Sequence, residues 1–174
     1  MRFLPGHIKA VIFDIDGTLV ETKTGAKFRK SPDDWQWLPG RKEYLQFLYQ
    51  QQGLKLGMAT NQGGVGMDYS ELKGQDVELI CEFVKMAQET GCFPDPKCIQ
   101  VCFTHPDANY KPELYQVKND RMRKPNPGML QELTHFFKVN PYEALYVGDR
   151  PEDEQAAHSA GLHFEWAEDF FKVS

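Results

Sequence analysis

The chain has 174 residues, of which 41% are hydrophobic and 26% charged, and it carries a formal net charge of -5. This ordinary globular balance argues against a disordered or fibrous protein, and we expect one domain, residues 1–174, with a single sizeable core. No apolar stretch approaches the length of a membrane span, the start does not resemble a secretory signal, and four cysteines are too few for a disulfide-stapled secreted domain, so we expect a cytoplasmic protein.

Short apolar segments alternate with helical periodicity along the chain. The pattern predicts strands at 8–14, 54–60, 98–103, 144–148 and 162–164, and helices at 40–52, 69–90, from 126 onward, and 152–160. In the long second helix we expect one buried face, formed by Leu72, Val77, Ile80, Val84 and Ala87. Asn126 and Pro127 are expected to open the third helix as cap and first residue.

Alternating strands and helices predict an α/β fold. We expect a single Rossmann-like, doubly wound parallel sheet with helices on both faces. Ligands of such sheets bind at the carboxyl ends of the strands, near a topological switch point.

Polar residues gather at those predicted strand ends. Asp14 and Asp16 follow the first strand, Thr60 and Asn61 end the second, and Asp149, Glu152 and Asp153 follow the fourth. The basic loop before the third helix ends in Arg123 and Lys124. Carboxylates favour a hard divalent cation such as Mg²⁺, and together with a lysine and a hydroxyl they suit phosphoryl transfer.

These residues resemble the motifs of a known superfamily. The stretch Asp14-Ile15-Asp16-Gly17-Thr18, then Thr60-Asn61, Lys124, and Gly148-Asp149 with Asp153 are similar to the four ordered motifs of the haloacid dehalogenase (HAD) phosphatases. The resemblance runs from residue 11 to about residue 165.

The resemblance implies a role for each of these residues. Asp14 would be the nucleophile and Asp16 the general acid and then base. Asp14, the backbone carbonyl of Asp16, Asp149 and Asp153 would hold Mg²⁺, with Asp153 a direct ligand or one that orients a metal-bound water. Thr60, Asn61, Lys124 and Arg123 would bind the substrate phosphate and its surroundings.

The short spacing of the first two motifs predicts a capless enzyme with an open site, as in subfamily III.

Two capless relatives compete as models for the substrate. The segments 60–64, 123–129 and 148–153 resemble the heptose bisphosphate and histidinol phosphate phosphatases, which carry a zinc loop. Here Cys102 keeps a ligand type, but Thr104, Asp120 and Met122 stand at the other ligand positions, so we expect no structural zinc. Cys92, Cys98, Cys102 and His105 offer a rival metal site, but Cys98 and Cys102 lie on a predicted strand, so we interpret these cysteines as small core-lining residues.

The second relative is the 3′-phosphatase domain of polynucleotide kinase/phosphatases, which the segments 22–35 and 161–171 resemble. Residues 21–42 and 105–124 together carry a net charge of +5 on an otherwise acidic chain. These segments, with Phe28, Trp35, Trp37, Tyr110 and Tyr115 among them, could contact a strand backbone and stack on bases, although packing of Trp35 and Trp37 onto the sheet edge is equally open.

We therefore favour a polynucleotide-3′-phosphatase-like enzyme over a small-molecule phosphatase of the heptose bisphosphate or histidinol phosphate type. The expected partner is a phosphorylated substrate. A catalytically silent HAD-fold binding protein is the weakest alternative, because Asp14, Asp16 and Lys124 are all retained.

Overall fold

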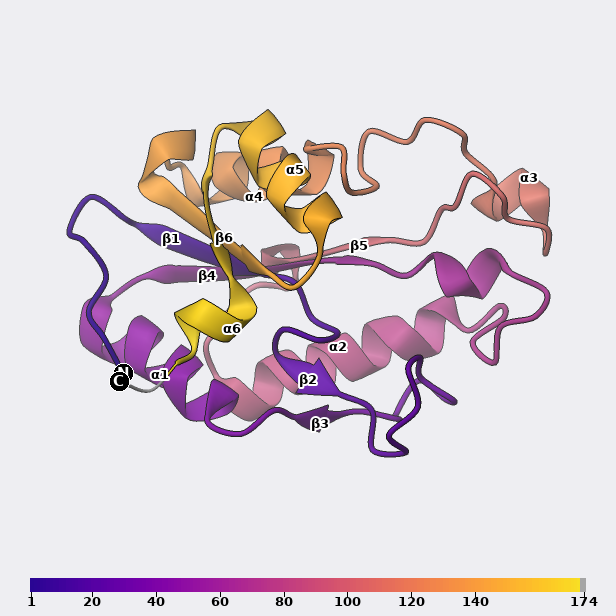
Figure 1. Cartoon of the computed structure of the whole chain (residues 1–174), viewed down its shortest axis with the longest axis horizontal. Coiled ribbons are helices and arrows are strands. Elements are labelled where there is room, and N and C mark those ends of the chain that lie inside the picture. Colours follow the sequence, from indigo (N-terminus) through magenta and orange to yellow (C-terminus); the bar gives the residue numbers. More distant parts are fainter. Residues whose placement is uncertain (173–174) are drawn as a thin grey trace.

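The computed structural model describes residues 1–172, and its centre is a five-stranded parallel sheet (Figure 1). The strand order is β5-β4-β1-β6-β7. The strands are β1 (Ala10–Phe13), β4 (Lys55–Asn61), β5 (Ile99–Cys102), β6 (Ala144–Gly148) and β7 (His163–Trp166). The α/β fold and the parallel sheet predicted from the alternating pattern are confirmed.

The central strand β1 lies between β4 and β6. Phe13 is in register with Met58 on one side and with Val147 on the other. From β1 the chain first adds β4 and then β5 on one side of the sheet, and later adds β6 and then β7 on the other side. The direction in which strands are added therefore reverses at β1. A crevice at such a switch point, outside the carboxyl ends of the strands, is where this fold binds ligands.

Helices cover both faces of the sheet. In Figure 1, α4 (Gly128–Phe137) and α5 (Pro151–Ala160) lie above the sheet, while α1 (Arg41–Gln52) and α2 (Asp76–Thr90) lie below it. Every residue of β1 is buried, as expected of a strand covered on both faces.

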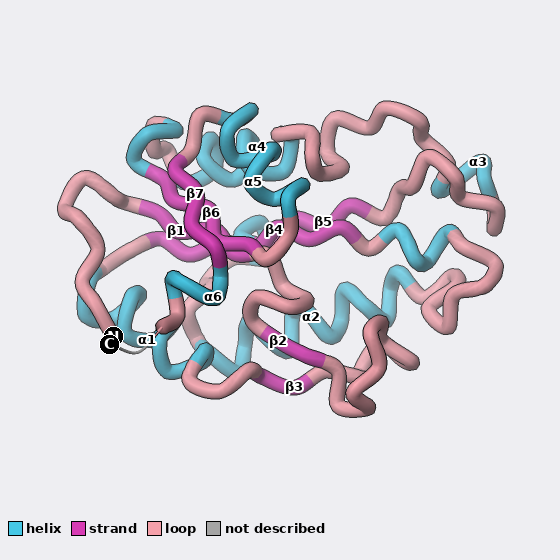
Figure 2. The backbone as a smooth tube through the Cα atoms, in the orientation of Figure 1, coloured by secondary structure: helices cyan, strands magenta, loops and turns pink. Residues whose placement is uncertain are grey.

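Short elements fill the connections. A two-stranded sheet pairs β2 (Val20–Glu21) with β3 (Gln36–Trp37), and α6 (Ala167–Phe170) follows β7. Figure 2 shows that the path from β5 to α4 is mostly loop, interrupted by α3 (Pro112–Tyr115). The 3₁₀ segments are η1 (Gly63–Gly66), η2 (Pro96–Cys98) and η3 (Pro141–Glu143). No large cap is inserted within residues 1–172.

Two expectations about the helices are wrong. The second helix begins at Asp76 rather than at 69, because η1 and a series of turns occupy the residues before it. Its buried residues are Leu79, Phe83, Met86, Ala87 and Thr90, whereas Val77 and Ile80 are exposed. The buried stripe is thus rotated from the predicted one and shares only Ala87 with it on this helix.

The predicted cap of the third helix is also wrong. This helix, α4, begins at Gly128 with Pro127 at the cap position. The Asn126 side chain instead donates to the Asp120 backbone carbonyl, at 2.8 Å. Asn126 therefore fixes the loop before the helix rather than its first turn.

The core includes three of the four cysteines. Cys92, Cys98 and Cys102 are buried and Cys81 is exposed, and all four are free thiols. This confirms the core-lining interpretation of the buried cysteines. Within residues 1–172, no helix is both long and apolar enough to cross a membrane.

Candidate active site

Asp14 and Lys124 form a buried ion pair at the carboxyl end of β1. Lys124 Nζ donates to Asp14 Oδ1 at 2.7 Å and to Asp153 Oδ1 at 2.6 Å. The Tyr146 hydroxyl and the Ala59 carbonyl also lie within hydrogen-bond distance of Nζ, at 2.8 and 3.0 Å, and share its remaining N–H. A buried charge is tolerated only when it is paired and hydrogen-bonded, and this ammonium is held on every side.

The same surroundings shift the acidities of this pair. Burial raises the pKa of Asp14 to about 7, against the opposing pull of the Lys124 ammonium. Burial alone would lower the pKa of Lys124, but the charges of Asp14 and Asp153 outweigh it and raise that pKa. The lysine therefore stays protonated. Burial makes the negative charge of Asp14 unfavourable, and a further cation close to Asp14 would stabilise that charge.

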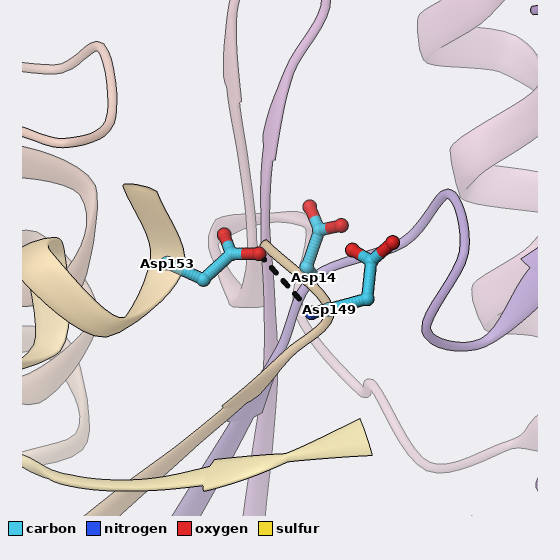
Figure 3. A group of neighbouring side chains, drawn as sticks. All are labelled: Asp14, Asp149 and Asp153. Carbon is cyan, nitrogen blue, oxygen red and sulfur yellow. Dashed lines mark hydrogen bonds between the residues drawn. The ribbon is translucent and has the colours of Figure 1, made fainter. Parts of the chain in front are cut away.

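Three carboxylates supply a place for that cation. Oxygens of Asp14, Asp149 and Asp153 lie within 4.8 Å of one another. Figure 3 shows Asp14 and Asp149 side by side, with Asp153 reaching in from α5, and its Oδ2 accepts a hydrogen bond from the Asp149 backbone N–H at 3.2 Å. Burial and the charge of Asp153 raise the pKa of Asp149. Clustered, poorly neutralised carboxylate oxygens are the donor set that Mg²⁺ prefers, so the residues fit this ion.

Two glycines make room for these carboxylates. A Cβ on Gly17, whose φ is +84°, would lie 2.3 Å from Asp149 Oδ2. A Cβ on Gly148 would lie 2.5 Å from the Cβ of Asp153. Side chains at either position would push an acid out of the cluster, which explains why glycine follows Asp16 and precedes Asp149.

Asp16 lies beside this cluster with both of its oxygens engaged. Arg29 Nε donates to Oδ1 at 2.9 Å, and Gln62 Nε2 donates to Oδ2 at 2.7 Å. Gln62 also donates to the Thr60 hydroxyl at 3.0 Å, which joins Asp16 to the end of β4. The sequence reasoning missed Arg29, Gln62 and Tyr146. Only Gln62 offered a signal, because it directly follows the Thr60-Asn61 motif.

The four residues predicted to bind phosphate meet around this point, but not in equivalent ways. Thr60 is buried at the end of β4, where its hydroxyl accepts the hydrogen bond from Gln62. Both polar atoms of the Asn61 side chain pair with the Lys124 main chain, at 3.0 and 3.1 Å. Arg123 Nη1 donates to the Thr104 carbonyl at 2.8 Å. Asn61 thus holds Lys124 in place, and its contact with phosphate stays a prediction.

The positions compared with a zinc loop come together in space as a hydrogen-bonded cluster. The Thr104 hydroxyl donates to Asp120 Oδ2 at 2.7 Å and lies 3.3 Å from Cys102 Sγ, and the Met122 N–H donates to Asp120 Oδ1 at 2.8 Å. Burial raises the pKa of the Cys102 thiol. Across residues 1–172, the one group of three or more His, Cys or acidic residues close enough to share an ion is the aspartate cluster.

The aromatic residues of the basic segments divide into packed and exposed ones. Trp35 is buried and its Nε1 donates to Glu82 at 2.8 Å, while Trp37 Nε1 donates to Glu89 at 2.9 Å. Both tryptophans are therefore held by α2, so they pack against this helix rather than onto the sheet edge. Tyr115 is also buried, whereas Phe28 is 65% exposed.

Comparison with known proteins shows which families this chain is similar to in sequence. A family model described as polynucleotide kinase 3 phosphatase matches residues 9–171. An uncharacterized 20.8 kDa protein of Autographa californica nuclear polyhedrosis virus is 34% identical over 142 residues, covering 81% of this chain and 65% of that protein. D-glycero-β-D-manno-heptose-1,7-bisphosphate 7-phosphatase of Neisseria meningitidis serogroup A is 29% identical, covering 88% and 74%.

Two further comparisons bear on the substrate and the fold. The bifunctional polynucleotide phosphatase/kinase of Schizosaccharomyces pombe is 29% identical over 94% of this chain, which spans 37% of that protein. Among solved structures, D,D-heptose 1,7-bisphosphate phosphatase of B. bronchiseptica, complexed with magnesium and phosphate, has a TM-score of 0.68 and 27% identity, covering 90% of this chain and 79% of that one.

Proposed function

This chain is a phosphatase of the HAD superfamily and belongs to the polynucleotide kinase 3 phosphatase family, and from that premise we propose that it is a Mg²⁺-dependent phosphomonoesterase acting through a phosphorylated Asp14. The observation that carries the proposal is the buried contact of Asp14 with Lys124 beside the three-carboxylate cluster. It combines a nucleophile, a fixed ammonium and a cation site at the switch point of the sheet.

The proposed reaction has two steps. An Asp14 oxygen attacks phosphorus, the bond to the leaving oxygen breaks, and Asp16 gives that oxygen its proton. Asp16 then takes a proton from water, the water oxygen attacks the phosphorus of the aspartyl phosphate, and phosphate and free Asp14 are released. Lys124 neutralises the negative charge that builds up on the phosphoryl oxygens, and Thr60 donates a hydrogen bond to them.

Mg²⁺, held by Asp14, Asp149, Asp153 and the Asp16 carbonyl, would supply the positive charge that draws the phosphate in and offsets repulsion from the nucleophile. The raised pKa of Asp14 gives a physical reason for this need. A bound cation would favour the deprotonated form of Asp14, which is the form that can attack phosphorus.

For the substrate we propose a 3′-phosphorylated polynucleotide end. The family match over residues 9–171 supports it, as does the similarity to the S. pombe phosphatase/kinase. The positive charge of residues 21–42 and 105–124 offers contacts for a strand backbone. The second candidate is a heptose bisphosphate or related small phosphate, which the similarity to the N. meningitidis and B. bronchiseptica enzymes favours.

A substrate panel separates these candidates. We expect Mg²⁺-dependent phosphate release from a 3′-phosphorylated oligonucleotide to exceed that from heptose 1,7-bisphosphate and histidinol phosphate in kcat/KM. EDTA and Asp14→Asn should abolish all of it. A clear preference for either small molecule would replace the polynucleotide assignment, and activity that survives both controls would remove the phosphatase mechanism itself.

A further inference from the structure

Arg29 is the one buried basic residue of the loop between β2 and β3. It is 5% exposed, and its side chain stacks over the Phe83 ring of α2, with Cζ 5.4 Å from the ring centroid. A guanidinium is removed from water at a large free-energy penalty unless a carboxylate pairs with it. Among residues 1–172, Asp16 is the one carboxylate within ion-pair distance, with Nη2 2.7 Å from Oδ1.

The loop that carries Arg29 is built around a buried acid, Asp34. Asp34 accepts hydrogen bonds from the Thr24 N–H at 3.0 Å, from the Thr24 hydroxyl at 2.8 Å, and from the Lys30 N–H at 2.9 Å. Arg29 Nη1 also donates to the Pro32 carbonyl at 3.0 Å. These contacts fix the guanidinium before any substrate arrives, so its position over Asp16 does not depend on a ligand.

Asp16 is therefore held from two directions. Arg29 takes Oδ1 and Gln62 takes Oδ2, yet each carboxylate oxygen has two lone pairs, and the Asp16 side chain remains 35% exposed. A carboxylate fixed in this way presents its remaining lone pairs in one direction. We propose that Arg29 is a positioning residue, which orients the Asp16 carboxyl toward the leaving oxygen of the substrate. This inference rests on the proposed function, in which Asp16 is the acid.

The test compares two aryl phosphates of similar size, 4-nitrophenyl phosphate and phenyl phosphate. The phenolate leaving group is the more basic and needs a proton in the transition state, whereas nitrophenolate leaves without one. The ratio kcat/KM reports the transfer of phosphate to Asp14, so the later hydrolysis does not enter. We expect Arg29→Met to lower kcat/KM for phenyl phosphate about 10- to 100-fold, a part of the usual contribution of a general acid, and that for 4-nitrophenyl phosphate only about 3-fold.

Three further variants separate positioning from folding. Arg29→Lys should recover part of the phenyl phosphate activity, because it restores a donor to Oδ1. Thr24→Val, which removes one hydrogen bond of the same loop, should lower Tm and leave the ratio between the two substrates unchanged. In an Asp16→Asn background, Arg29→Met should have little further effect, because both act through one carboxyl.

An equal loss on both substrates in Arg29→Met, or additive losses with Asp16→Asn, would overturn the inference and make Arg29 a structural residue. A wild-type enzyme with no Mg²⁺-dependent turnover of either aryl phosphate would instead contradict the proposed function, and the inference with it. The two failures are thus distinguishable.

Discussion

At the scale of single residues, the site depends on how closely side chains approach one another. Lys124 lies 2.7 Å from Asp14 and 2.6 Å from Asp153, so three charges share a space that excludes water. In such surroundings electrostatic interactions are far stronger than at the surface. Removing Lys124 would leave two buried carboxylates without their common partner. This destabilises a fold more than replacing the whole ion pair with apolar residues does.

Gly17 gives a prediction at this scale. Gly17→Ala should weaken Mg²⁺ binding by about 10-fold or more, because the new Cβ would overlap Asp149 Oδ2 and the loss of one ligand of this kind reduces affinity strongly. Calorimetric titration of Mg²⁺ into the metal-free protein measures the change.

Gly25→Ala is the matched control for that variant. Gly25 also has a positive φ, +72°, but no atom lies within 4 Å of its added Cβ. Both variants therefore carry the backbone strain of a left-handed alanine, about 1 kcal/mol, and only Gly17→Ala disturbs the ligands. Equal Mg²⁺ affinities in the two variants would show that Asp149 does not bind the ion.

The strand-end residues were predictable because β-strand signals and charge are local. Asp14, Thr60 and Asp149 directly follow or end apolar runs, and parallel pairing brings such ends to one edge. Arg29 could not be found this way. It lies thirteen residues after Asp16 in a loop without periodicity, and its pairing depends on the hydrogen bonds of Asp34 and on packing against α2.

At the scale of elements, the second helix shows where periodicity misleads. Val77, Ile80 and Val84 repeat at helical spacing, and so do Leu79, Phe83 and Met86, which are the residues that the fold buries. Two stripes about one residue apart cannot be told apart from the spacing alone. The glycines at 63, 64, 66 and 74 lie before Asp76, and these flexible positions favour the turns found there.

The loop from β5 to α4 depends on one acid, Asp120. Burial would raise its pKa, but hydrogen bonds from Thr104 and Met122 outweigh burial and lower that pKa. A lowered pKa means that the folded state favours the carboxylate. Its contribution to stability is therefore present above the pKa of the unfolded chain and is lost as the pH falls through the lower folded value.

Asp120→Asn should accordingly destabilise the protein by about 1–2 kcal/mol at neutral pH, because it weakens hydrogen bonds to a charged acceptor. The difference from wild type should shrink as the pH falls below about 4, where the wild-type carboxyl is protonated in the unfolded chain. Urea unfolding at several pH values measures both effects. Asp107→Asn, an exposed residue of the same loop, is the control, and an equal loss there would remove the special role of Asp120.

At the scale of the whole molecule, the fold explains the position of the chemistry. The strand order reverses at β1, and the nucleophile candidate follows β1 directly. The neighbouring strands β4 and β6 deliver Thr60 and Asp149 to either side of it. Lys124 and Asp153 come from the loop before α4 and from α5, two elements on the same face of the sheet (Figure 1). One sheet edge thus assembles groups that are up to 139 positions apart in the chain, from Asp14 to Asp153.

Substrate choice follows from other parts of the molecule. HAD phosphatases with different substrates have this site in common. The site is therefore stronger evidence for the type of reaction than for the identity of the substrate. The segments 21–42 and 105–124 reach the site through Arg29, which pairs with Asp16, and Lys124, which pairs with Asp14, and they carry the positive charge. Sequence and fold therefore agree on the chemistry, while the substrate panel has to decide between a polynucleotide end and a small phosphate.

In the proposed mechanism, Asp14 carries the phosphoryl group during turnover. The most direct measurement is mass spectrometry of the enzyme quenched in acid while it turns over an aryl phosphate with Mg²⁺. We expect one added phosphoryl group on the peptide that contains Asp14, and none in Asp14→Asn. Turnover without any phosphorylated peptide, or with the group on a different residue, would contradict it.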